Sequence, residues 1–183
     1  MRIISGTARG RLIEAPQGRN TRPTLDKVKE ALFGSIQFDI PDSRVLDLFA
    51  GSGNLGLEAL SRGARQAVFN DCSAECVRII KNNAEKLGFL DRAVVMQRDY
   101  AACLAFFAGK EPFDFIFIDP PYHSDLARPA VEQIFAQGLL AKGGRIVIER
   151  QARDGSEYPG RLLSVRKYGD TELVFLTNPE SES

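Results

Sequence analysis

The tetrapeptide Asp119-Pro120-Pro121-Tyr122 follows an apolar run, FDFIFI, and its residue types could perform group transfer to an amine. Proline fixes its own φ and restricts the residue before it, so the Asp119 carboxylate and the Pro120 carbonyl should point in set directions. These two acceptors could hold the two N–H bonds of an exocyclic amine and aim its lone pair at an electrophilic carbon. Asp119 would stabilise the positive charge that develops on nitrogen, and Tyr122 could stack on a nucleic-acid base. The proton could leave through Asp119 or to solvent.

A glycine-rich turn spans residues 51–56 and has the spacing G-x-G-x-x-G. Gly51 and Gly53 would let the backbone turn sharply and approach a ligand closely. Asp71 lies at the offset of a ribose-binding acid, which suits both a nicotinamide dinucleotide and S-adenosylmethionine. Asp47 favours the second ligand, because a carboxylate suits its cationic amino-acid portion and is badly placed beside a pyrophosphate. The sequence therefore predicts S-adenosylmethionine, with S-adenosylhomocysteine as the product.

Two other residues near these motifs, Asp99 and His123, each have more than one possible role. Asp99 could accept a hydrogen bond from an adenine amine, cap the following helix, or do both. His123, the only histidine, could contact a base or a phosphate, or be an ordinary loop residue. We assign the cofactor to Asp47, Phe49, Gly51, Ser52, Gly53, Asp71, Cys72, Asp99 and Tyr100.

The elements that must position these residues alternate between strand and helix. Expected strands cover residues 44–49, 67–71, 93–98, 113–119 and 144–150, and expected helices cover 73–87, 100–108 and 126–138. A further short helix is expected to follow the glycine turn and to end at Leu60. Such alternation predicts parallel strands joined by right-handed crossovers. Residues 161–168 and 171–177 are expected to form an antiparallel hairpin around Gly169–Asp170. The predicted fold is α/β and doubly wound, like a Rossmann sheet, and open sheets of this kind bind ligands at the carboxyl ends of their strands.

A separate entry region precedes this core. Residues 2–5 and 11–15 are expected to be two short strands, and residues 16–23 a loop. Thr24 is expected to cap a helix whose apolar stripe holds Leu25, Val28, Leu32 and Ile36. We divide the chain into an N-terminal extension (1–43), a core (44–178) and a disordered tail (179–183).

Composition limits the class of protein. The 183 residues carry no net charge, but residues 1–30 hold seven basic residues against three acidic ones, which would suit phosphate binding. Cys72, Cys76 and Cys103 lack disulfide or zinc spacing, so we expect reduced, buried thiols and no metal. The N-terminus lacks a signal peptide's apolar core, and no apolar run is long enough for a membrane span, so we expect a cytoplasmic protein that is not bound to a membrane.

The combined motifs resemble the bacterial 16S ribosomal RNA guanine-N2 methyltransferases of the guanine-966 type. The resemblance rests on RIISGTARGRLIEAP at the start, TRPTLDKVKEALF (21–33), DLFAGSGNLGLEALSRGA (47–64), Asp71 and DPPY (119–122). It implies a seven-stranded fold, catalysis at Asp119–Tyr122, and 16S rRNA as partner, within the 30S subunit or an assembly intermediate, for a monomeric enzyme. Many relatives have Glu-x-Asp where this chain has Asn70-Asp71-Cys72. Residues expected near the RNA are Arg9, Arg11, Arg22, Pro23, Thr24 and His123.

Three other functions are compatible with parts of this pattern. DPPY also occurs in enzymes that methylate adenine N6 in DNA or glutamine in proteins, although this chain has no evident target-recognition domain. The glycine turn could belong to an NAD-dependent oxidoreductase, which usually has a separate substrate domain. A nonenzymatic RNA-binding protein would keep its function without Asp119.

Overall fold

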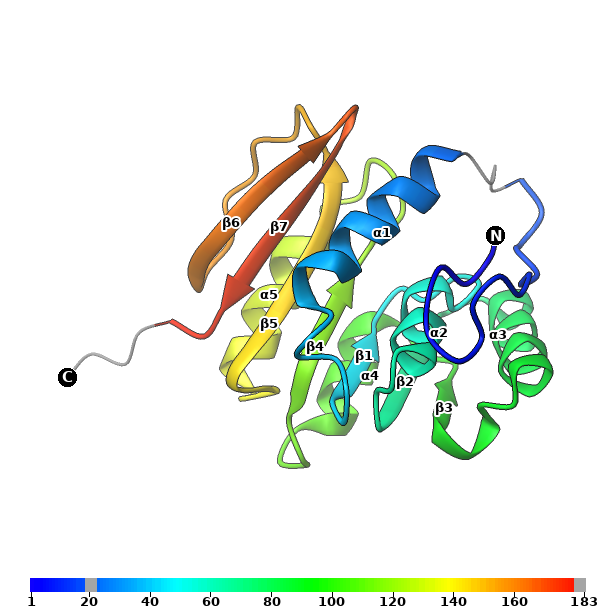
Figure 1. Ribbon diagram of the computed structural model, residues 1–183. Helices are drawn as coiled ribbons and strands as arrows, with labels where there is room; N and C mark the ends of the chain where they lie inside the picture. Colours follow the sequence, from blue (N-terminus) through cyan, green and yellow to red (C-terminus); the bar gives the residue numbers. More distant parts are fainter. Residues whose placement is uncertain (19–22, 180–183) are drawn as a thin grey trace.

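The structure, a computed structural model, describes residues 1–18 and 23–179 and centres on a seven-stranded sheet (Figure 1). The strands are β1 (Arg44–Asp47), β2 (Gln66–Asn70), β3 (Ala93–Met96), β4 (Phe113–Ile118), β5 (Leu140–Gln151), β6 (Arg161–Tyr168) and β7 (Thr171–Thr177). Their order in the sheet is β3-β2-β1-β4-β5-β7-β6. The first five strands are parallel, and β7 is antiparallel to both β5 and β6. The predicted parallel sheet with a C-terminal antiparallel hairpin is confirmed.

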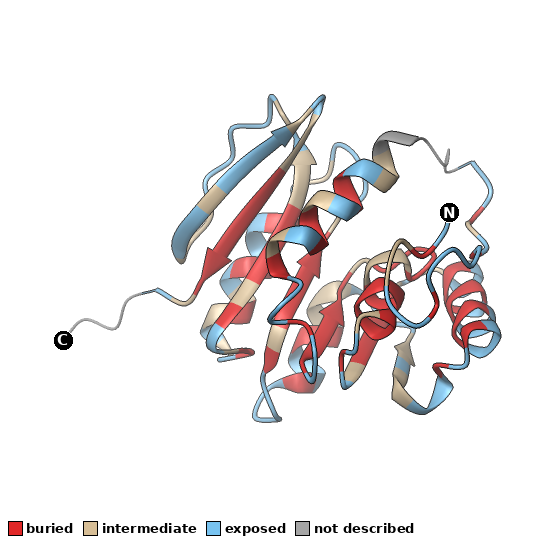
Figure 2. Cartoon of the chain, in the orientation of Figure 1, coloured by how far each residue is buried: buried red, intermediate tan, exposed pale blue. Residues whose placement is uncertain are grey.

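Helices cover both faces of the sheet. They are α1 (Pro23–Ile36), α2 (Asn54–Ser61), α3 (Ala74–Leu87), α4 (Tyr100–Phe107) and α5 (Ala127–Ala136), with a short 3-10 helix, η1 (Leu90–Arg92). One buried cluster joins α1, α2 and α3 to alternate residues of the strands, such as Phe117 and Val147. A second cluster joins α4 and α5 to the intervening residues, such as Ile118 and Ile148. Figure 2 shows β1 and β4 buried along most of their length, as strands covered on both faces must be.

Local sequence explains the helix ends. In α3 the Ser73 side chain accepts a hydrogen bond from the backbone N–H of Cys76, and Gly88 ends the helix in the left-handed region at φ 75°. Buried Val77, Ile80 and Ala84 follow helical spacing on the face that packs on the sheet. The expected amphipathic helix is confirmed, beginning one residue later than predicted.

The ends of several elements are shifted by one or two residues from the expected bounds, and three expectations differ more substantially from the structure. Residues 2–5 and 11–15 form one isolated antiparallel bridge, Arg2 with Leu12, rather than two strands. Helix α1 begins at Pro23, so Thr24 lies inside its first turn rather than before it. Strand β5 begins at Leu140, four residues earlier than predicted, because Phe113 pairs with Leu140 before the register shifts. The pair Gly143–Gly144 hid this early start, since glycine disfavours a strand prediction.

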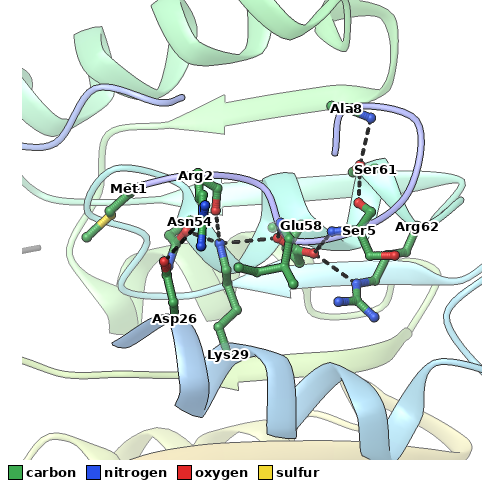
Figure 3. Close-up of polar contacts among 12 residues, drawn as sticks. Met1, Arg2, Ser5, Ala8, Asp26, Lys29, Asn54, Glu58, Ser61 and Arg62 are labelled. Carbon is green, nitrogen blue, oxygen red and sulfur yellow. Dashed lines mark hydrogen bonds and ion pairs between the residues drawn. The ribbon is translucent and has the colours of Figure 1, made fainter. Parts of the chain in front are cut away.

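The N-terminal segment, defined as residues 1–13, is fixed to the core by a buried acid (Figure 3). The Glu58 side chain on α2 is fully buried and accepts hydrogen bonds from the backbone N–H groups of Ile4 and Ser5, at 2.9 and 3.0 Å. It also pairs with Lys29 of α1 at 3.2 Å and with Arg62 at 2.9 Å. Buried charges need such partners, and here one carboxylate ties the segment and α1 to α2.

Apolar side chains reinforce this attachment. Ile3 and Ile13 are buried in the same cluster as Phe33 and Phe117, so the N-terminal segment contributes to the core. The backbone N–H of Ala8 also donates to the Ser61 hydroxyl at 3.0 Å. Within residues 1–18 and 23–179, no helix is long and apolar enough to cross a bilayer.

Candidate active site

The glycine turn lies between β1 and α2, where its three glycines have two different roles. Gly51 and Gly53 have φ values of 58° and 81°, a region that favours glycine. Gly56 is instead required by packing, because a Cβ there would lie 2.3 Å from Phe69 Cε1 on β2. Helix α2 therefore packs closely on the sheet.

Asp47, the last residue of β1, forms a hydrogen bond with the backbone of the first turn of α2. Its carboxylate is buried, and its Oδ2 accepts the backbone N–H of Gly56 at 2.9 Å. One oxygen of Asp47 thus fixes the start of α2. The contact that we expected between Asp47 and a cationic ligand group stays a prediction.

Asp71 links the ends of β1 and β2. Its Oδ2 accepts the backbone N–H of Gly51, and its Oδ1 accepts that of Ser73, both at 2.9 Å. Each carboxylate oxygen can accept more than one hydrogen bond, so the half-buried Asp71 can still bind two hydroxyls in a bidentate contact. Its neighbour Cys72 is exposed, contrary to the expectation that all three thiols are buried, because it lies beyond the end of β2.

Asp99 caps α4, one of its two expected roles. Its Oδ1 accepts the backbone N–H of Ala102 at 2.9 Å, and the side chain stays exposed. The rings of Phe49 and Tyr100 lie beside each other with centroids 5.8 Å apart, which brings the residues after β1 and β3 together. This pair supplies an apolar wall for a planar group, while the adenine contact of Asp99 stays a prediction.

The DPPY motif follows β4 and lines a pocket of about 390 Å³. Asp119 and Pro120 are half-buried, whereas the Tyr122 side chain is 72% exposed and open for stacking. His123 adopts φ 61°, a left-handed conformation that is uncommon outside glycine. Strand β1 pairs with β2 on one side and with β4 on the other, so the glycine turn lies between Asp71 and the DPPY corner.

The predicted RNA-contacting residues lie in different places. His123 lines the DPPY pocket, whereas Arg9 lines a separate cavity with Arg2 and Lys27 beside α1. Arg11 donates to the backbone carbonyl of Lys86 at 2.6 Å, so its guanidinium is partly occupied. Arg22 lies outside the described residues, as does most of the predicted tail. Pro23 and Thr24 form the first turn of α1, and only their backbone is described.

Glu149, the acid at the end of β5, was not among the residues predicted from the sequence. Glu149 lines the same pocket as Asp119, together with Arg150, Arg153 and Tyr158. Burial and the nearby Asp119 carboxylate raise the pKa of Glu149 to about 8. The runs FDFIFID and GRIVIER each carry an acid near their carboxyl end, but no local pattern shows that the two acids meet, because this depends on the pairing of β4 with β5.

Comparisons with known proteins agree with this geometry. A family model described as Conserved hypothetical protein 95 matches residues 1–177. The Escherichia coli K12 protein named ribosomal RNA small subunit methyltransferase D is 36% identical over 157 residues, which cover 85% of this chain and 77% of that protein.

Solved structures share the fold. A hypothetical protein from Thermus thermophilus superposes with a TM-score of 0.82 and 32% identity, covering 96% of this chain and 98% of its own. A 16S rRNA N2-guanine methyltransferase from the same species, solved with AdoMet and guanosine, gives a TM-score of 0.74 at 22% identity over 90% of this chain and 45% of its own. At 22% identity, the similarity to the N2-guanine methyltransferase shows a shared fold and nothing more.

Proposed function

We propose, from the premise that this chain belongs to the family described as Conserved hypothetical protein 95, that it is an S-adenosylmethionine-dependent methyltransferase acting on guanine N2 in 16S rRNA. The observation that carries the proposal is the placement of Asp119-Pro120-Pro121-Tyr122 on the strand next to the glycine turn. This edge brings a turn built for close approach to a ligand beside two acceptors for an amine.

The residues at this edge fit S-adenosylmethionine. Asp71, bound to two backbone N–H groups, presents a fixed carboxylate that would accept the ribose hydroxyls. Gly51 and Gly53 would let the backbone approach the ligand, and the rings of Phe49 and Tyr100 would line its adenine side. When bound, S-adenosylmethionine supplies an electrophilic methyl group.

The DPPY corner would act on the acceptor amine. The Asp119 carboxylate and the Pro120 carbonyl would accept the two N–H bonds of guanine N2, which orients the nitrogen lone pair. Negative charge on Asp119 would stabilise the positive charge that develops on nitrogen. The exposed Tyr122 ring would stack on the base, an interaction worth about 1–3 kcal/mol.

The proposed RNA substrate rests on the names of the relatives and on the motifs that resemble the guanine-966 methyltransferases. The Escherichia coli relative is named for the small subunit's rRNA, which supports 16S rRNA as the partner here. We propose that the enzyme acts as a monomer in the cytoplasm, on the 30S subunit or an assembly intermediate, at the guanine-966 position. Residues 1–43 would form the RNA-binding extension of a methyltransferase core at 44–178.

A methyl-transfer assay tests the activity and the substrate together. Labelled S-adenosylmethionine is offered with 30S subunits, naked 16S rRNA, DNA or protein, and the labelled product is digested and identified. We expect N2-methylguanine from the ribosomal substrates. Label found only in DNA or protein would favour the other amino-methyltransferases, and calorimetric binding of NADH without binding of S-adenosylhomocysteine would favour an oxidoreductase.

The variant Asp119→Ala tests the chemical role. We expect the transfer rate to fall by about 100-fold or more, with S-adenosylhomocysteine affinity nearly unchanged, because Asp119 would act chiefly in the transition state. The control Asp91→Ala removes an exposed aspartate on η1 and should keep the wild-type rate. A wild-type rate for Asp119→Ala would contradict the mechanism.

A further inference from the structure

The end of β5 places a second acid directly beside Asp119. Strands β4 and β5 are parallel, with Phe117 opposite Val147 and Ile118 opposite Ile148. The next pair in this register is Asp119 and Glu149. Because side chains alternate along a strand, both acids point to the face that holds Phe117 and Val147. Asp119 and Glu149 also both line the 390 Å³ pocket.

The other charged groups around Glu149 are arranged differently. Arg150 points to the opposite face of β5 and pairs with Glu172 of β7, its Nη2 lying 2.9 Å from Oε2. His123 and Asp125 line the pocket from the loop after β4, and Tyr158, Arg153 and Asp154 line it from the segment after β5. On the Glu149 face, α1 carries Asp26, Lys27, Lys29 and Glu30. Lys29 pairs with Glu58, and Asp26 pairs with Arg2. Asp119 is the charged neighbour that raises the proton affinity of Glu149.

The proton affinity of this pair matters for methylation of an amine. After methyl transfer the nitrogen carries a positive charge. It must then lose one proton to give the neutral methylated amine. An ordinary aspartate has a pKa near 4, so it takes this strongly acidic proton readily but holds it weakly. A neighbouring base of higher pKa would therefore draw the proton on from the aspartate. Burial and the Asp119 charge raise the pKa of Glu149 to about 8, which makes its ionised form a much stronger base near physiological pH.

We propose that Glu149 is the terminal proton acceptor of the reaction and acts through Asp119; this inference rests on the proposed function. The N2 lone pair forms the N–CH₃ bond as the S–CH₃ bond breaks, and that bond's electron pair goes to sulfur. The nitrogen then loses one proton to the Asp119 carboxylate and keeps the N–H electron pair. Asp119 passes this proton to ionised Glu149, which later releases it to solvent.

The pH dependence of the transfer rate tests the proposal. Glu149 must be ionised to accept a proton, so the wild-type single-turnover rate should rise with pH, by up to tenfold per unit, and level off above about pH 8. Glu149→Gln should be about 100-fold slower at pH 8.5 and should lose the rise. Glu149→Asp keeps an ionisable group and should retain a pH-dependent rate between those of Gln and wild type.

Two controls separate this role from a structural one. Glu85→Gln makes the same substitution at an exposed position of α3 and should match the wild-type profile. Calorimetric binding of S-adenosylhomocysteine by Glu149→Gln should equal that of the wild type, because Glu149 lies on the amine side of the site. A Gln variant that is slow yet keeps the wild-type pH rise would make Glu149 a structural acid and overturn the proposal.

The remaining outcomes separate a failure of the proposed role of Glu149 from a failure of the proposed function. A wild-type rate that falls as pH rises through 8 would mean that protonated Glu149 is the active form. This result would overturn the proton relay, defined as proton transfer from Asp119 to Glu149, and would leave the methyltransferase assignment intact. A Gln variant with the wild-type rate and profile would do the same. A wild-type enzyme that methylates no ribosomal substrate at any pH would overturn the proposed function, and the relay with it.

Discussion

Two ionisable side chains near the site, Glu149 and Lys29, have pKa values displaced toward their neutral forms by burial. Their surroundings nevertheless differ. The carboxylate of Glu58 opposes the displacement at Lys29, whereas the carboxylate of Asp119 adds to that at Glu149. Repulsion between like charges is unfavourable for stability, and ionisable groups whose pKa values are displaced in this way are common at catalytic sites.

This repulsion should appear in the stability of the protein. The pKa of Glu149 is higher in the folded chain than its usual value of 4.5, so the folded state holds this proton more tightly. The stabilisation that protonation gives is complete below about pH 4.5 and is lost as pH rises to about 8. Glu149→Gln cannot ionise, so its Tm relative to wild type should increase by several degrees between pH 5 and pH 8 and stay constant above.

Thermal unfolding followed by circular dichroism across this pH range measures the difference. Glu85→Gln, at an exposed carboxylate, serves as the reference and should show no such trend. A constant Tm difference for Glu149→Gln would show that Glu149 ionises as easily in the folded chain as in the unfolded one.

At the residue scale, the sequence predicted the groups whose signal is local. Gly51, Gly53 and the DPPY motif each follow an apolar strand, and their positions after β1 and β4 are confirmed. Glu149 was missed because its significance depends on the pairing of β4 with β5, which no local pattern contains. The requirement for glycine at position 56, where a Cβ would collide with Phe69, likewise depends on how α2 packs against β2.

At the element scale, the alternation of strands and helices was sufficient to predict the sheet, whereas the N-terminal segment was not predictable. Its attachment to α2 depends on Glu58, which is buried although glutamate is almost never fully buried unless it is paired. The segment is thus held through side-chain contacts with the core rather than through strand pairing of its own.

Glu58→Gln should therefore be strongly destabilising. It removes the charge that compensates buried Lys29 and weakens the acceptor for Ile4, Ser5 and Arg62, a change that typically costs about 3–5 kcal/mol. Urea unfolding measures this loss. The matched control is Glu132→Gln, which breaks an exposed i,i+4 pair with Arg128 and should cost less than about 1 kcal/mol. Similar losses for both variants would mean that the Glu58 network contributes no more than a surface ion pair.

At the scale of the whole molecule, the basic residues must be tested without disturbing the core. Deleting the N-terminal segment would remove Ile3 and Ile13 from the buried cluster, so weaker RNA binding after deletion could reflect unfolding. Arg9 is a better probe, because it is exposed and makes no hydrogen bond or ion pair through its side chain with any residue in the described ranges. It lies on the segment that the resemblance assigns to RNA.

Arg9→Ala should weaken binding of the enzyme to 16S rRNA by about two- to tenfold and reduce the slope of log affinity against log salt by about 0.7–1. The physical reason is the loss of one phosphate contact, and with it the release of the counterions that this phosphate had condensed. Affinity for S-adenosylhomocysteine should not change. Arg128→Ala is the matched control, because this exposed arginine lies on α5, across the sheet from the N-terminal segment, and should leave the slope as it is. Equal slopes for Arg9→Ala and wild type would place the RNA on another part of the surface, and the segment would then be a structural element of the core.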